Sequence, residues 1–90
     1  MNIDYANLEK DVADGTFRQR LEEELTIGFR QIQLTGERLP VASHYAAQIA
    51  EIVNRNAELS AFMKYELYQE ILVAVEAARV AVLGEEAKPS

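Results

Sequence analysis

The chain has no cysteine, a single histidine and only two prolines among its 90 residues. Without cysteine it can form no disulfide, no thiolate metal site and no cysteine nucleophile. The lack of cysteine fits a reducing compartment, so we expect a cytoplasmic protein. A chain this short buries only about 60 % of the surface that its unfolded form exposes, and no staple supports the core. Oligomerisation is therefore a natural source of further burial.

The chain also lacks an excess of basic residues and a long apolar run. Its nine basic and fifteen acidic residues give a net charge of −6. This charge disfavours binding to nucleic-acid phosphates and to anionic membrane surfaces. The N-terminal residues contain no segment typical of a secretory signal. The apolar run 71–83 carries two charges and is shorter than the roughly 20 residues of a membrane span. We therefore expect neither nucleic acid nor a membrane as a direct partner.

Most of the chain follows helical periodicity, with apolar residues recurring at every third or fourth position. The sequence predicts an all-α fold, a small bundle of three to four helices. We expect these helices at about 4–13, 17–35, 41–55 and 57–83. Together they form a single domain.

Capping residues mark the expected helix ends. Asn2 or Asp4 is suited to cap the first helix, and Gly15 is suited to end it. Thr16 and Gln19 match a capping box at the start of the second helix. Farther along the chain, Thr35-Gly36 is a stop signal, and Pro40 places the next start near Val41. Gly28 falls inside the second helix, where it is either a tolerated defect or a point of close approach by another helix.

The segment 41–83 contains neither glycine nor proline, so two arrangements are open. It forms either one continuous helix or two helices with a break within residues 54–60, where Asn56 and Ser60 are possible new starts. We favour the break, because ordinary helices average about 11–12 residues. Gly84 is expected to close the last helix, so that residues 1–84 form the domain and residues 85–90 a flexible tail.

No catalytic constellation is present in the sequence. Ser43 and His44 are adjacent, so on a helix their side chains diverge by about 100° and make no dyad. A di-metal carboxylate bundle needs two Glu-x-x-His pairs, which one histidine cannot supply. No calcium loop or glycine-rich phosphate loop is found. We therefore expect a protein that is not an enzyme and has no metal and no cofactor.

The segment 71–83 is apolar on nearly every side and is interrupted only by Glu76 and Arg79. A helix with one solvent face shows polar residues at every third or fourth position, so we expect another polypeptide to share the covering of this one. The candidate interface comprises Phe62, Tyr65, Tyr68, Ile71, Leu72, Val75, Glu76, Arg79 and Val82. Phe29 and Arg30 are a second candidate, since arginine and aromatic residues are enriched at binding hot spots.

The sequence favours a non-enzymatic helical module for protein–protein interaction or oligomerisation. The expected partner is another copy of the chain, in a homodimer or a higher oligomer. One alternative is a small acidic inhibitor or regulator that occludes a basic, nucleic-acid-facing surface of its target. Another is a small subunit or co-chaperone of a secretion or phage assembly. The sequence does not identify a partner or a pathway.

Overall fold

Four α-helices follow a short 3₁₀ turn in the computed structural model, which describes residues 5–87 and the side chains of residues 5–84. The elements are η1 (Tyr5–Asn7), α1 (Leu8–Asp14), α2 (Thr16–Leu34), α3 (Ala42–Asn56) and α4 (Ala61–Ala87). No strand occurs in this described part, so the chain forms an all-α bundle, as the sequence predicts. The bundle is elongated, with extents of 45 × 22 × 19 Å.

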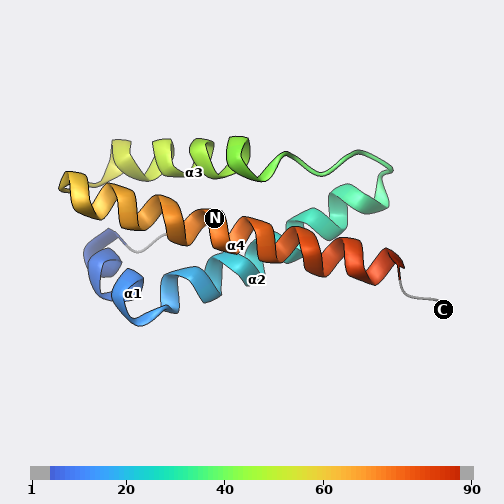
Figure 1. Cartoon of the computed structure of the whole chain (residues 1–90), viewed down its shortest axis with the longest axis horizontal. Coiled ribbons are helices and arrows are strands. Elements are labelled where there is room, and N and C mark those ends of the chain that lie inside the picture. Colours follow the sequence, from blue (N-terminus) through green and yellow to red (C-terminus); the bar gives the residue numbers. More distant parts are fainter. Residues whose placement is uncertain (1–4, 88–90) are drawn as a thin grey trace.

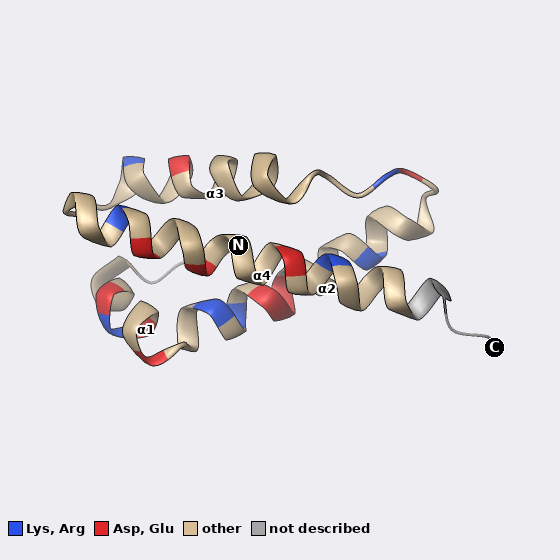
Figure 2. Ribbon diagram, viewed as in Figure 1, with Lys and Arg blue, Asp and Glu red and all other residues tan. Residues whose placement is uncertain are grey.

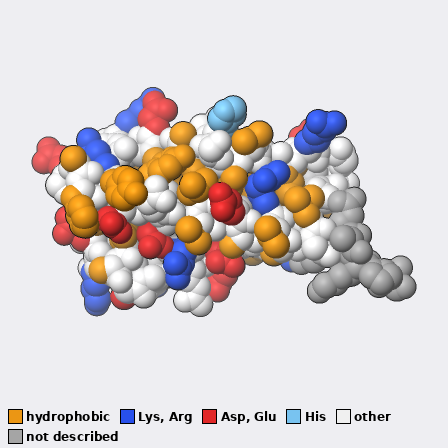
Figure 3. Space-filling model, in the orientation of Figure 1, with side chains coloured by type: hydrophobic (Ala, Val, Ile, Leu, Met, Phe, Trp, Pro, Cys, Tyr) orange, Lys and Arg blue, Asp and Glu red, His pale blue; other side chains and the backbone are white. Residues whose placement is uncertain are grey.

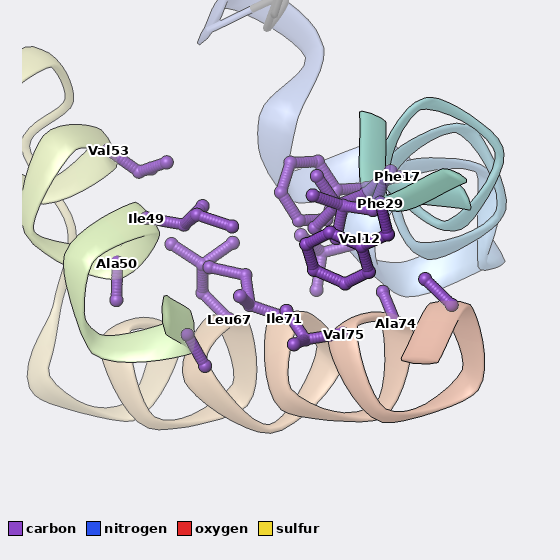
Figure 4. Close-up of a cluster of buried hydrophobic side chains, with 14 of the residues drawn as sticks. Val12, Phe17, Phe29, Ile49, Ala50, Val53, Leu67, Ile71, Ala74 and Val75 are labelled. Carbon is purple, nitrogen blue, oxygen red and sulfur yellow. The ribbon is translucent and has the colours of Figure 1, made fainter. Parts of the chain in front are cut away.

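The longest helix, α4, is the element on which the others assemble. Helices α2 and α3 pack along it, and α1 packs against both α2 and α4 (Figure 1). Side chains from α2 and α3 converge on the inner side of α4 (Figure 4). The buried core consists of Leu8, Val12, Phe17, Leu21, Leu25, Phe29, Ala46, Ile49, Ala50, Val53, Leu67, Ile71, Ala74, Val75, Ala78 and Val82.

The junction between α1 and α2 differs from the predicted capping box. Gly15 alone separates the two helices, in the left-handed conformation with φ 83°. Thr16 is already helical, and its backbone N–H donates to Asp14 Oδ1 over 2.9 Å. Gln19 donates its backbone N–H to the Gly15 carbonyl at 3.1 Å. With a single residue in the connection, the carboxylate before the turn takes the place of the threonine cap. The expected caps Asn2 and Asp4 lie outside the described residues.

Gly28 lies within α2, and a Cβ built on it would have no neighbouring atom within 4 Å. The alternative of a close helix approach at this glycine is therefore wrong. The core position beside it belongs to Phe29. Phe29 packs edge-on against Tyr45 of α3, with ring centroids 5.4 Å apart and planes inclined by 61°.

Two connections separate α2, α3 and α4. Gly36 adopts a left-handed φ of 80° after α2, and Val41 is extended before α3 begins. The predicted break after α3 is confirmed, because Ala57 is extended and α4 begins at Ala61. Ser60 Oγ accepts the backbone N–H of Met63 at 3.2 Å, which satisfies a donor that the first turn of α4 leaves unpaired.

Helix α4 continues beyond the predicted stop at Gly84 and reaches Ala87. The prediction that Gly84 ends the helix is wrong, since Gly84 lacks the left-handed conformation that Gly15 and Gly36 adopt. Residues 85–87 of the expected tail are thus helical, and residues 88–90 lie outside the described part. Among the helices described, none combines the length and the apolar character that crossing a membrane requires.

Candidate protein-interaction surface

The side of α4 that faces away from the core carries large apolar side chains. Phe62 is 69 % exposed, Val73 46 % and Val80 70 %. Tyr65 and Leu83 are exposed on the same helix. Hydrophobic side chains form a band along this face of the molecule, where α4 runs in front of α2 (Figure 3). We call the set Phe62, Tyr65, Val73, Val80 and Leu83 the outer face of α4.

Helical geometry places these five residues on one side of α4. Phe62 and Val80 are eighteen positions apart, as are Tyr65 and Leu83, and eighteen residues make about five full turns. Each pair therefore lies on one line along the helix. Val73 lies close to the line that joins Phe62 and Val80, between these two residues. The outer face thus forms a stripe with a length of about 30 Å at a rise of 1.5 Å per residue.

Polar side chains occupy the same side of α4 in smaller number. Gln69 and Glu76 are exposed there, and Glu66 and Arg79 are half-buried. The sequence allows Glu76 and Arg79 to pair along the helix surface, but the structure contains no ion pair between them. Neither makes a salt bridge with any residue whose side chain is described (5–84). Arg79 Nε is shielded from solvent and has no hydrogen-bond partner.

The structure divides the interface residues expected from the sequence into three groups. Ile71, Val75 and Val82 lie in the chain's own core with at most 2 % exposure, so they are not available to a docking partner in this fold. The half-buried members are Tyr68, Leu72 and Arg79, and the exposed members are Phe62, Tyr65 and Glu76. Burial therefore shifts the candidate surface from the whole helix to one side of it.

The second candidate pair is also divided. Phe29 is 1 % exposed and packs against Tyr45, so its ring contributes to the core and not to the surface. Arg30 is exposed on α2. These two neighbours therefore point to different sides of the helix and do not form a joint anchor.

Sequence reasoning did not include Val73, Val80 and Leu83 in the interface. The sequence does show that two of them share a side of the helix, because Val73 and Val80 are seven positions apart. Once the stripe centred on Ile71 is known to face the core, 3.6-residue periodicity puts Val73 and Val80 on the opposite side. What the sequence lacked was the direction of the core.

The exposed apolar residues of α2 are fewer and stand among charges. Ile27 and Leu34 are exposed and seven positions apart, a spacing that Val73 and Val80 share. Arg20, Glu23 and Arg30 are exposed on the same helix. The outer side of α2 is therefore a mixed, solvated surface, whereas α4 presents a longer apolar stripe.

Acidic and basic residues are distributed over all four helices and interleaved (Figure 2). Arg18 of α2 lies 3.6 Å from Glu70 of α4, and Arg55 pairs with Glu51 within α3. No helix of the described part gathers the carboxylates onto a face of their own. This distribution gives no support to an acidic inhibitor that covers a basic surface.

Hollows and polar clusters offer little chemistry. A surface hollow of about 460 Å³ lies beside Gly28 and is bordered by Ile27, Ile32 and Tyr45. A second, of about 670 Å³, lies between η1 and the connection that precedes α4. Ser43 and His44 are both exposed on α3. Within the described residues, no three acidic or histidine side chains come together as they would around a metal ion.

The pKa of the Asp14 carboxyl departs from its ordinary value. Hydrogen bonds from the hydroxyl and the backbone N–H of Thr16 lower the pKa of Asp14 below its ordinary value of 3.8. This carboxylate is fully exposed at the junction of α1 and α2, and it lines neither of the two hollows. Its role is local and structural.

Comparison with protein families, with curated proteins and with solved structures found no match to this chain.

Proposed function

We propose that this chain is a non-enzymatic helical interaction module that self-associates through the outer face of α4. The observation that carries the proposal is the exposure of Phe62, Val73 and Val80 along one side of the central helix. Exposed apolar stripes of this kind are a feature of protein-interaction sites. The absence of cysteine adds a reducing, cytoplasmic compartment to the proposal.

The expected affinity follows from two opposing contributions. Complete burial of a Val, Leu or Phe side chain contributes about 1.5–3 kcal/mol, and the chain itself already covers part of each residue of the outer face. The remaining gain must offset the lost translational and rotational freedom of two molecules. We therefore expect self-association in the micromolar range of dissociation constants.

The direct test replaces the two exposed valines by a polar helix former. Sedimentation equilibrium of the unmodified chain at high micromolar concentration should give the mass of a dimer or a higher oligomer. The double variant Val73→Gln/Val80→Gln should sediment as a monomer and keep its helical circular dichroism. A dissociation constant raised about tenfold corresponds to 1.4 kcal/mol of lost contact energy.

The chain offers a matched control on α2. Ile27 and Leu34 are exposed aliphatic residues at the same spacing, so Ile27→Gln/Leu34→Gln makes the same kind of change outside the proposed surface. This variant should associate like the unmodified chain. An unmodified chain that stays monomeric at high micromolar concentration, or a control that dissociates as readily as the α4 variant, contradicts the proposal.

A further inference from the structure

Two opposite charges lie beside the outer face of α4 and have no partner among the described side chains. Glu76 is exposed and Arg79 is half-buried, and neither forms an ion pair with a described side chain. Arg79 Nε is shielded from solvent and makes no hydrogen bond. A half-buried guanidinium without an acceptor costs free energy, so a carboxylate that reaches its accessible end is favoured. The carboxylate of another polypeptide meets this requirement.

From this arrangement we propose that a second copy of the chain occupies the outer face between Val73 and Leu83, with the two α4 helices antiparallel. The two-fold axis passes between Glu76 and Arg79, so that Glu76 of each copy faces Arg79 of the other. The inference rests on the interaction surface proposed above and specifies its partner and orientation. In a two-fold interface, residue i of the first copy contacts residue j of the second, and residue j of the first contacts residue i of the second.

The neighbouring residues fit the same axis. Leu72, Glu76, Arg79 and Leu83 are separated by four, three and four positions, which is the spacing of a seam between two paired helices. The axis that joins Glu76 to Arg79 also places Leu72 opposite Leu83 of the second copy. Two ion pairs then lie between two leucine pairs, which limits their access to water.

The exposed valines lie beside this seam. Val73 and Val80 each follow a seam residue, Leu72 and Arg79, by one position. Their exposure puts them on the side of the seam that faces away from the chain's own core. The same axis brings Val73 close to Val80 of the second copy, so the largest exposed aliphatic surface of α4 is covered as well.

Charge decides between the two possible orientations. A parallel, in-register pair places Glu76 against Glu76 and Arg79 against Arg79, and juxtaposed like charges disfavour an interface. The antiparallel pair replaces both repulsions by attractions. Ion pairs in such positions act mainly on register and orientation rather than on affinity, so the apolar residues provide the association and the charges its direction.

The first experiment reverses the charges. Glu76→Arg alone or Arg79→Glu alone places like charges at both ion pairs and should raise the dissociation constant by at least about tenfold. The double variant Glu76→Arg/Arg79→Glu restores opposite charges in the antiparallel pair and should recover the dimer to within a few-fold. Sedimentation equilibrium measures all four proteins, with circular dichroism as the control for folding.

The second experiment measures orientation directly. Because the chain has no cysteine, the single variants Ala61→Cys and Ala81→Cys each carry one spin label at an exposed site of α4. At a rise of 1.5 Å per residue, the antiparallel axis separates the two copies of residue 61 by about 50 Å and those of residue 81 by about 10 Å along the helix. A parallel pair gives similar short distances at both sites. Pulsed electron paramagnetic resonance distinguishes the two.

The possible outcomes separate this inference from the proposed function. A long distance at residue 61, a short one at residue 81 and recovery by the double charge reversal support the antiparallel dimer. A dimer with short distances at both sites, or one that the double reversal does not recover, overturns this inference and leaves self-association intact. An unmodified chain that remains monomeric overturns both.

Discussion

Both sides of α4 carry large apolar side chains, but their surroundings differ. On the inner side, Leu67, Ile71 and Val75 have no exposed surface, whereas Phe62 and Val80 on the outer side are largely exposed. The difference arises because α2 and α3 pack on one part of the helix circumference and leave the rest open (Figure 1). Apolar composition therefore shows that a helix needs covering, but not which part its own chain covers.

The largest expected effect is on the free energy of unfolding, when one side chain on each side of α4 is truncated to alanine. Ile71→Ala removes a fully buried side chain and should lower the free energy of unfolding by about 2–5 kcal/mol, because the cavity is only partly refilled. Val80→Ala should change it by less than about 0.5 kcal/mol in the monomer, as an exposed position does. Urea unfolding at a protein concentration below the dissociation constant measures both. Equal losses at the two positions would show that the inner and outer sides are not distinct.

A smaller effect tests how far α4 extends toward the C-terminus. In the structure Gly84 is an interior helical residue with open space around it, so Gly84→Ala should stabilise the chain by up to about 1 kcal/mol. If Gly84 instead ended the helix in the left-handed conformation, the same change would be destabilising. The control is Gly15→Ala, where φ is 83° and alanine should cost about 1–2 kcal/mol. Thermal unfolding of both variants gives the two signs.

The smallest effect concerns the junction between α1 and α2, which both pack against α4. Hydrogen bonds from Thr16 lower the pKa of Asp14, so the carboxylate stabilises the fold at neutral pH. This contribution is complete above the ordinary value of 3.8 and is lost as the pH falls through the lowered pKa. Asp14→Ala should therefore unfold at a slightly lower temperature than the unmodified chain at pH 7.

The control for this last change is its pH dependence. The difference between Asp14→Ala and the unmodified chain should shrink once the pH falls well below 3.8, where both lack the charge. Asp14→Asn keeps an acceptor oxygen for Thr16, so its difference from the unmodified chain at pH 7 should be smaller than that of Asp14→Ala and should likewise shrink in acid. A deficit of Asp14→Ala that persists unchanged in acid contradicts the role given to the carboxylate.

The sequence by itself determined the fold class and the approximate helices. Apolar periodicity is visible over a few helical turns, and a capping signal such as Ser60 involves only a few residues. Both can therefore be recognised without knowing which helices pack nearby. The break between α3 and α4 followed from such signals. Gly84 shows their limit, because glycine permits a helix end without requiring one.

Only the tertiary structure decided which side of α4 is covered. Periodicity assigns a direction to a helix with one apolar stripe, but α4 is apolar on several sides, so its pattern indicates no single core direction. The positions of α2 and α3 supply that direction through contacts between residues far apart in the chain. Those contacts bury Ile71 and Val75 and leave Val73 and Val80 outside, a division that no local signal in the sequence contains.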